Sequence, residues 1–447
     1  MMSSPEHNNT TEGDEFNIEV PAPYVDNGTA PVDPERYYTR EFMEKEWDRV
    51  WTRIWNVAGR APDMPEVGDY VTFNLLHESF ILVRTGEGEN DIRAFYNVCI
   101  HRGNRLVEAH MGHVSEGFAC AYHGWVFDID GSLKEITMRE QFRDEVVAHL
   151  KGLKEVRCDL WAGFVFINMD DDAPPLLDYL GDLPRQLDGY HMERMVVVND
   201  LVADWPSNWK TAMDNFNESY HVHWVHWQLH SSFDEAHQFD LYENGHCRTI
   251  TKHQSLDAVD ENAEVPDAMW HTLSYGGLTP ENFQGTAGEA QKKLNEFREE
   301  RAQLLGLKRS NIADGQLYYL LWPNMIISLH PEAAILLQTL PHETDPDKFT
   351  FMLSTIAHPI QNSEYDLHDI MITPKGTDLS GMTRPQREVI DFVDERLGAV
   401  LIQDTAIVPR VQRGMKSRGI TGLIYGEREQ RIRHLHKELD RYINGEK

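Results

Sequence analysis

Four residues in one short stretch of the chain have the types and the spacing of a metal site. The sequence reads Cys99-Ile-His101 and, after eighteen intervening residues, Cys120-Ala-Tyr-His123. Each arm brings one thiolate and one imidazole, whereas zinc ribbons usually pair two cysteines on each arm. This donor set suits a [2Fe–2S] cluster in which one iron has two Cys ligands and the other has two His ligands.

The residues around these four ligands favour the same interpretation. Gly103 and Gly124 follow the two histidines closely, and glycine allows the backbone to turn tightly and aim N–H groups at sulfur. The alternative is a structural Cys2His2 zinc knuckle. The flanking sequence predicts strands that meet at loops rather than a zinc finger, and this favours the cluster.

A second region, residues 208–226, is rich in histidine. It holds Glu218, His221, His223 and His226, with His230 and His237 close behind. Two imidazoles and one carboxylate around an open site form the ligand set of non-haem Fe(II) oxygenases. On an ideal helix His221 and His226 lie about 140° apart and converge only where the helix bulges or unwinds. His226 and His230 would share one face without distortion, so spacing alone leaves both pairs open.

Both regions resemble the α subunit of Rieske non-haem iron oxygenases, the aromatic ring-hydroxylating dioxygenases, and the resemblance covers most of residues 35–430. Its basis is the C-x-H-R-G and C-x-x-H-G-W loops, and E-x-x-H-x-x-x-x-H preceded by Asn-Trp-Lys and Asp-Asn-Phe. The resemblance implies that Cys99, His101, Cys120 and His123 hold the cluster. It also implies that His221, His226 and Asp404 hold a mononuclear Fe(II), and that Glu218 and Asn215 are catalytic residues.

Position 218 departs from the usual pattern of this family. Most members have Asp there, and the resemblance makes it the bridge between the Rieske histidine and the catalytic iron of adjacent subunits. In this chain position 218 is Glu, as in some demethylating or quaternary-amine members of the family. The longer side chain still reaches a His N–H, so we expect the role to be kept. Asp391 and Glu395, which precede Asp404, are expected on a solvated helix face.

Composition bounds the function further. The 447 residues carry a formal net charge of −31, which argues against nucleic-acid binding. No apolar stretch is long enough to cross a bilayer, and the start lacks a signal-peptide core. Two of the four cysteines, Cys158 and Cys247, are left over as expected buried thiols, which indicates a reducing cytoplasm. The basic segment 410–418 is either a solvated face or a docking surface for an acidic ferredoxin.

The elements that position these residues change along the chain. Residues 1–30 are expected to be a mobile tail, and 31–60 an N-terminal helix, N-capped by Asp33, that packs on the catalytic domain. Short β-type runs between Gly68 and Met169 predict an all-β Rieske domain over 61–172, with the cluster ligands at two hairpin tips. Residues 173–447 are expected to form the catalytic mononuclear iron domain.

In this second domain, α and β patterns are mixed. Strands are expected at 195–198, 317–330, 333–339 and 349–358, and helices at 209–229, 289–305, 384–413 with some interruption, and 427–443. The fold class is therefore α+β: an all-β domain followed by an antiparallel sheet covered by helices.

The expected function is that of a terminal oxygenase component. No G-x-G-x-x-G follows a strand, so electrons from NAD(P)H must arrive through a separate reductase or ferredoxin. The resemblance implies a head-to-tail homotrimer, with or without β subunits. The expected reaction is O2-dependent hydroxylation or dihydroxylation of a small hydrophobic, aromatic substrate. The alternative is a monooxygenase that performs oxidative O- or N-demethylation or hydroxylates a non-aromatic substrate.

Two other protein classes are alternatives to an oxygenase. A Rieske electron carrier with a large binding module would have no iron at His221, His226 and Asp404. A zinc hydrolase would be expected to show H-E-x-x-H, which is missing, and Glu218 precedes its histidine rather than following it.

Overall fold

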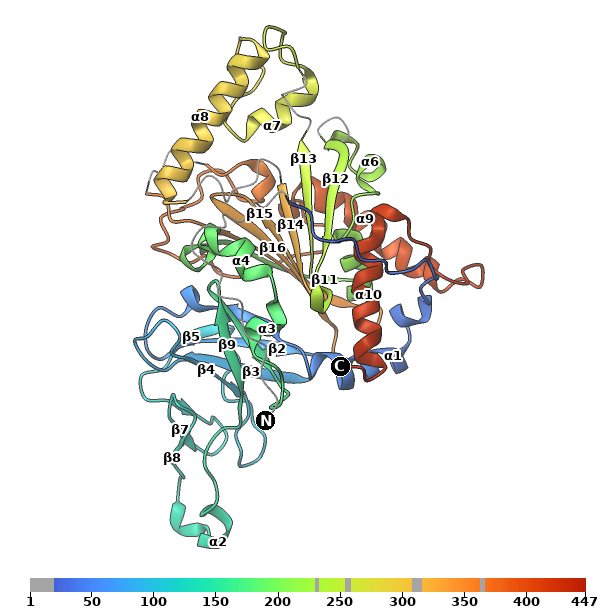
Figure 1. Cartoon of the computed structure of the whole chain (residues 1–447). Coiled ribbons are helices and arrows are strands. Elements are labelled where there is room, and N and C mark those ends of the chain that lie inside the picture. The colour runs from blue at the N-terminus through green and yellow to red at the C-terminus, as the bar shows by residue number, and fades with distance from the viewer. Residues whose placement is uncertain (1–19, 230–232, 254–258, 308–315, 362–365) are drawn as a thin grey trace, which may run out of the picture.

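The computed structural model describes residues 20–229, 233–253, 259–307, 316–361 and 366–447 (Figure 1). Most of the predicted tail and His230 lie outside these residues. Residues 20–30 lie against the body of the protein, where the backbone N–H of Ala22 donates to Asp240 over 2.6 Å. None of the helices in the described residues is long and apolar enough to span a membrane.

The first half of the chain is built on an antiparallel sheet of seven strands in the order β1-β10-β9-β4-β3-β2-β5. The strands are β1 Asn56–Arg60, β2 Asp69–Leu75, β3 Glu78–Arg84, β4 Ile92–Tyr96, β5 Met111–His113, β9 Glu155–Trp161 and β10 Phe164–Asn168. A separate three-stranded sheet holds β6 Phe118–Ala119, β7 Val126–Phe127 and β8 Leu133–Glu135. Figure 1 shows this small sheet and α2 at one end of the molecule.

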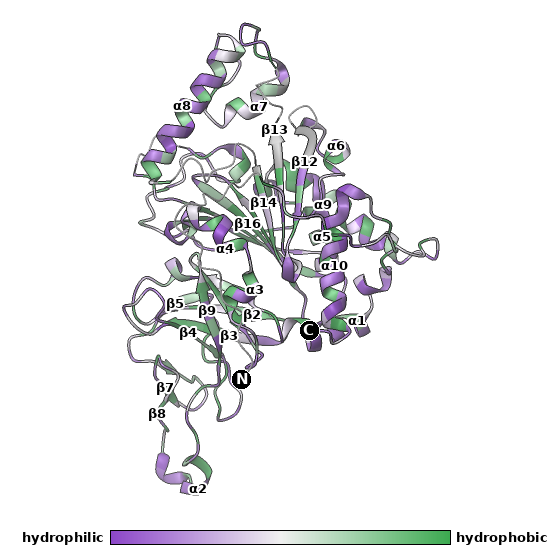
Figure 2. Cartoon of the chain, in the orientation of Figure 1, coloured by the Kyte–Doolittle hydropathy of each residue, from purple (hydrophilic) through white to green (hydrophobic). Residues whose placement is uncertain are grey.

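The second half contains an eight-stranded sheet in the order β12-β13-β14-β15-β16-β17-β11-β18. Its strands are β11 Val196–Trp205, β12 Phe233–Leu241, β13 Cys247–His253, β14 Gln316–Leu321, β15 Met325–Leu329, β16 Ala333–Pro341, β17 Phe349–Ala357 and β18 Glu388–Val389. Every pair is antiparallel except β11 with β18. Side chains of β15 and β16 are buried throughout, and these central strands are largely hydrophobic in Figure 2.

Ten α-helices surround the sheets in the described residues. They are α1 Arg40–Glu46, α2 Asp144–Val147, α3 Leu176–Leu180, α4 Leu183–Leu187, α5 Trp209–Phe216, α6 Val222–Val225, α7 Trp270–Ser274, α8 Ala287–Leu305, α9 Gly398–Met415 and α10 Gln430–Ile443. One hydrophobic core joins the two large sheets, because Val71 and Leu82 of the first belong to the same buried cluster as Leu337 and Leu353 of the second. The predicted α+β class is confirmed.

Two predicted helices are wrong in their extent. The helix expected over 209–229 breaks after Phe216, because the Glu218 carboxylate accepts the backbone N–H groups of Tyr220 and His221 in place of helical carbonyls. The helix expected from 384 begins only at Gly398. Pro385 disfavours helical backbone at residue 384, and β18 adds to the sheet instead.

The N-terminal segment also differs from a single helix. Asp33 caps its start as predicted, accepting the backbone N–H of Glu35 over 2.9 Å, but the first turn is a 3-10 helix over Pro34–Tyr37. After α1, the turn Trp47–Trp51 is π-helical. The strand β1 follows and joins the first sheet, although the predicted division places residues 56–60 in the N-terminal helix segment. Strands β12 and β13 were not predicted.

Candidate metal centres

The first candidate site is formed by two loops of the same construction. In each loop the glycine N–H donates to the cysteine carbonyl four residues back over 2.9 Å, Gly103 to Cys99 and Gly124 to Cys120. Both glycines have positive φ, +78° and +69°, a conformation that other residues adopt only under strain. The two loops therefore present a Cys and a His each from a matched, tight turn.

Ring packing holds the two histidines of these loops side by side. The ring centroids of His101 and His123 lie 4.6 Å apart, and His101 stacks on Trp125 at 4.8 Å with an interplanar angle of 5°. The Nδ1 atoms of both histidines are buried and have no hydrogen-bond partner in the described residues. Two buried, unpartnered ring nitrogens on one side of a loop pair fit ligation of a metal.

The two cysteines are buried and receive backbone hydrogen bonds. Burial raises the pKa of the Cys99 thiol, and the N–H of His101 acts against that rise. At Cys120 burial also opposes ionisation, but the N–H groups of Tyr122 and His123 outweigh it and lower the pKa. N–H groups aimed at sulfur stabilise thiolates and tune the potential of an iron–sulfur cluster.

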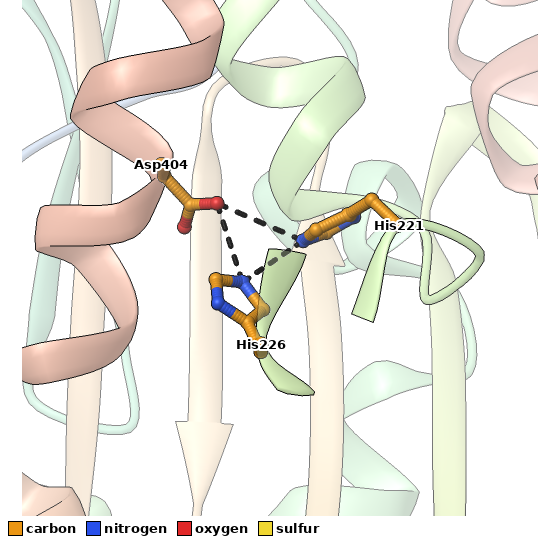
Figure 3. A group of neighbouring side chains, drawn as sticks. All are labelled: His221, His226 and Asp404. Carbon is orange, nitrogen blue, oxygen red and sulfur yellow. Dashed lines mark hydrogen bonds and ion pairs between the residues drawn. The ribbon is translucent and has the colours of Figure 1, made fainter. Parts of the chain in front are cut away.

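The second candidate site joins a broken helix to a late one. Residues 217–221 leave helical order between α5 and α6, which brings His221 and His226 to face each other although they are five apart (Figure 3). Asp404 projects toward them from α9. The Nε2 atoms of the two histidines are 3.1 Å apart, and Asp404 Oδ1 lies 3.3 Å from His226 Nε2 and 3.7 Å from His221 Nε2.

Hydrogen bonds on the far side of each ring determine which nitrogens face one another. His221 Nδ1 contacts the Glu218 carboxylate, which only accepts, so this nitrogen carries the proton. His226 Nδ1 lies 2.7 Å from Gln403 Oε1, and the amide of Gln228 fixes the orientation of Gln403 through a hydrogen bond in each direction. Each Nε2 therefore presents a lone pair toward the other.

In these tautomers the two Nε2 atoms and the Asp404 oxygen are all hydrogen-bond acceptors, so none of them can donate to another. Asp404 is 2 % exposed, and its Oδ1 has no hydrogen-bond partner in the described residues. A cation between the three atoms removes this conflict, and two imidazoles with one carboxylate are the donor set that suits Fe(II). Burial lowers the affinity of His221 for a proton, but the hydrogen bond and charge of Glu218 outweigh burial and raise its pKa, which makes the ring a more basic ligand.

A cavity of 130 Å³ opens beside these three residues. Its walls are largely apolar, with Phe216, Leu337 and Leu401 among them, and its polar lining includes Asn215 and Glu218. The Nδ2 atom of Asn215 is buried without a partner in the described part of the chain. The site thus combines a candidate metal-binding cluster with an adjoining open cavity that suits a small organic molecule.

Other residues near the predicted site lie outside the cavity. Trp224 and Trp227 are 90 % and 73 % exposed, and Asp391 and Glu395 are exposed as expected. His223 lines the cavity but is not among the three clustered ligand atoms. Sequence reasoning missed Gln228, Gln403 and Arg431. Adjacency to Asp404 is the one signal that points to Gln403, and nothing local points to the others.

Comparisons with known proteins identify two domains in this chain. Residues 54–153 match the family model of the Rieske [2Fe-2S] domain, and residues 192–445 match that of the ring hydroxylating alpha subunit, catalytic domain. The chain is 27% identical over 396 residues to the carnitine monooxygenase oxygenase subunit of Escherichia coli (strain K12), covering 87% of this chain and 85% of that protein.

Dioxygenases are similar as well. The chain is 32% identical to the biphenyl 2,3-dioxygenase subunit alpha of Rhodococcus jostii (strain RHA1), but only over 207 residues, so the match spans 45% of this chain and 44% of that relative. The fold matches naphthalene 1,2-dioxygenase with indole bound, with a TM-score of 0.67 and 20% identity over 96% of this chain and 95% of the other. The protein has a Rieske [2Fe–2S] domain and a non-haem iron catalytic domain, and it belongs to the α subunits of the Rieske non-haem iron oxygenases, which are O2-dependent oxidoreductases.

Proposed function

We propose that this protein is the terminal oxygenase component of a multicomponent system that hydroxylates a small organic substrate with O2. The observation that carries the proposal is the cluster of the half-buried His221 with the buried His226 and Asp404, whose facing atoms are a suitable donor set for a bound cation. Fe(II) at such a site supplies activation of O2, with electrons passed singly from a Rieske cluster.

The residues of the chain take the following roles in this proposal. Cys99, His101, Cys120 and His123 hold the cluster, and His221, His226 and Asp404 hold the mononuclear iron. Glu218 accepts a hydrogen bond from His221 Nδ1–H and so keeps the Nε2 lone pair free for the metal. Asn215 offers an unpartnered amide N–H to a molecule in the cavity. The proposed division has an N-terminal segment over 31–55 that contacts α9 and α10, a Rieske domain that begins with β1 and ends near residue 172, and a catalytic domain over 173–447.

Electron delivery in the proposal runs between subunits of a homotrimer. Figure 1 places β7 and β8, next to the cluster loops, at the opposite end of the molecule from α6. Three aromatic side chains beside Glu218 are exposed: Tyr220, Trp224 and Trp227. Exposed aromatics of this size are typical of an interface, and the cluster loop of a second copy is the occupant that brings the two iron sites together.

The trimer can be tested by substitution in this aromatic patch. We expect Trp224→Glu with Trp227→Glu to give a monomer by light scattering while the iron and sulfide content stays unchanged, because neither side chain lines the cavity. A trimer that survives both substitutions contradicts the proposed interface. Separate measurements on co-purified material show whether β subunits are present.

The substrate body is hydrophobic in this proposal, which fits the apolar walls of the cavity and hydroxylation or dihydroxylation of an aromatic compound in its catabolism. A specific observation favours a second candidate, oxidative demethylation or hydroxylation of a non-aromatic substrate. Position 218 is Glu, and the match to a carnitine monooxygenase spans 85% of that protein. A cytoplasmic location is proposed because Cys158 and Cys247, the two cysteines outside the proposed cluster site, form no disulfide.

The proposal is tested by the metal content of protein purified without oxygen. We expect about three irons and two acid-labile sulfides per chain, falling to about two and two in Asp404→Ala. NADH-dependent O2 consumption with added reductase and ferredoxin should be lost in the same variant. About two irons and two sulfides in both proteins, with no retention of added Fe(II), would make the chain an electron carrier instead.

A further inference from the structure

We propose that the substrate of the iron site carries a carboxylate group and that Arg431 binds it. This inference rests on the proposed function, because it identifies the substrate class of the same cavity. Arg431 carries a buried positive charge that has no role among the proposed metal ligands.

Arg431 lies in the first turn of α10 and lines the cavity that His221, His226 and Asp404 also line. It is 3 % exposed. Arginine is seldom buried this far unless it is paired, because removing a charge from water is costly. A guanidinium in the wall of a substrate cavity therefore needs an explanation.

The hydrogen bonds of Arg431 leave one end of the guanidinium without a partner. Nε donates to Cys247 Sγ over 3.4 Å, and Nη1 donates to Thr249 Oγ1. Nη2 is buried and has no acceptor in the described residues. On the same helix, the buried Arg433 differs, because its Nη atoms donate to the carbonyl oxygens of Ala30 at 2.8 Å and Tyr425 at 2.7 Å.

The charge of Arg431 is also uncompensated. Its two acceptors are a thiol and a hydroxyl, and no carboxylate of the described residues forms an ion pair with it. Cys247 does not act as a thiolate: it is buried, burial raises its pKa, and its S–H donates to Asn217 Oδ1 over 3.3 Å. By contrast, the buried guanidinium of Arg248 forms an ion pair with Asp240 at 2.7 Å.

The carboxylates that share the cavity are already engaged. Glu218 contacts the ring of His221 and two backbone N–H groups, and Asp404 faces the two histidines. The acceptor for the Nη2 atom of Arg431 must therefore come from the ligand. A planar guanidinium with free N–H groups favours a carboxylate, which accepts through two oxygens.

The rest of the ligand follows from the remaining walls. The same cavity is also lined by Phe216, Val400 and Leu401, which offer apolar contact and no charge. A cavity of 130 Å³ suits a small body. The structure thus assigns to the site a small carboxylic acid with an apolar body, anchored at one end so that the other end is presented to the iron.

The test compares acids with their neutral amides. Binding of benzoate, phenylacetate, cyclohexanecarboxylate and γ-butyrobetaine, each beside its primary amide, is measured by calorimetry on the iron-loaded enzyme. We expect at least one acid to bind about 10-fold or more tightly than its amide. This preference should disappear in Arg431→Gln and be partly kept in Arg431→Lys. Arg433→Gln, which changes a buried arginine outside the cavity, should keep it.

Iron content and the visible spectrum of the cluster show whether each variant is folded and loaded. The inference is wrong if no acid in the panel binds more tightly than its amide up to about 10 mM, or if the preference survives Arg431→Gln. Either result leaves the proposed oxygenase intact, provided the mononuclear iron is present. Loss of that iron in the unmodified protein would instead contradict the proposed function.

Discussion

Gln403 offers the sharpest test of how the iron ligands are oriented. Its Oε1 lies 2.7 Å from Nδ1 of His226 and accepts a second hydrogen bond from Gln228 at 2.9 Å. Replacing it in Gln403→Leu leaves the buried Nδ1–H of His226 without an acceptor. The imidazole ring of His226 can then find an acceptor for its N–H only by moving the proton to Nε2 or by rotating. Both changes remove the Nε2 lone pair that faces Asp404.

The size of the effect follows from this one lost acceptor. Leaving a buried donor unsatisfied costs about 1–3 kcal/mol, and loss of an outer hydrogen-bond partner of a metal ligand typically weakens metal binding about 10–100-fold. Since 1.4 kcal/mol corresponds to a factor of about ten, the two values agree. We therefore expect the affinity of the mononuclear site of Gln403→Leu for Fe(II) to fall about 10–100-fold.

The assay is equilibrium competition for Fe(II) with a chromogenic chelator, and the absorbance of the intact [2Fe–2S] cluster is the internal standard. Gln403→Glu keeps an acceptor and should bind iron close to normally. Gln228→Leu removes only the partner of Gln403, so its loss should be smaller. Our reasoning is refuted if Gln403→Leu holds iron as tightly as the unmodified protein while Asp404→Ala loses it.

Three further predictions concern other parts of the molecule. His246 is fully buried, accepts the N–H of Trp322 at Nδ1 and donates from Nε2 to the Tyr179 carbonyl, and burial lowers its pKa to about 4. Because the unfolded chain binds this proton near pH 6.5 and the folded protein only near pH 4, stability should fall as the pH drops through that window. In urea unfolding we expect the free energy of unfolding to fall by about 2 kcal/mol between pH 7 and pH 5 because of His246, and His246→Gln should lack this contribution. An identical pH dependence in the variant and the unmodified protein would contradict the role of His246. Lys210 and Glu46 form a buried ion pair at 2.8 Å. Glu46→Gln leaves the Lys210 charge unpaired and should lower the free energy of unfolding by about 3 kcal/mol, whereas the double variant Lys210→Met with Glu46→Leu should recover most of that loss. Equal losses in the two variants would show that the pair itself stabilises the fold. The basic segment 410–418 is exposed at Arg410, Arg413, Lys416 and Arg418, and Lys416 pairs with Asp347. Arg413→Glu with Lys416→Glu should slow stopped-flow reduction by an acidic ferredoxin without changing metal content, and unchanged kinetics would exclude this face as the docking site.

The sequence predicted best where chemistry and spacing are local. The two cluster loops are short, their four ligands lie within 25 residues, and alternating strands predict the hairpins around them. Some ends in the catalytic domain were close, as for α8, where only the first two residues were missed. The strand expected over 317–330 was wrong, because it is two strands, β14 and β15, and β11 continues beyond the expected 195–198 to Trp205. The Rieske domain, the mononuclear iron domain and the α+β class are confirmed.

The errors arose where a single side-chain contact or the packing of distant segments decides local structure. Periodicity predicted one helix through residues 209–229, and the break appears only because Glu218 turns back onto the backbone. Whether His226 pairs with His221 or with His230 was open from spacing, and the break allows His221 and His226 to converge. Arg431 looked like any polar residue of an amphipathic helix, because its burial depends on how α10 packs against Cys247 and Thr249 of β13.

The position of α10 has a consequence for how this enzyme can change over time. The helix contributes Arg431 to the cavity but none of the metal ligands, which come from the region of α6 and from α9. If Arg431 anchors the substrate as proposed, this contact is encoded in a different segment from the metal ligands, although α9 supplies both Asp404 and part of the cavity wall. Substitutions at position 431 can then change substrate preference without altering the residues proposed to hold iron, so we expect related proteins to differ at this position while they keep the metal ligands.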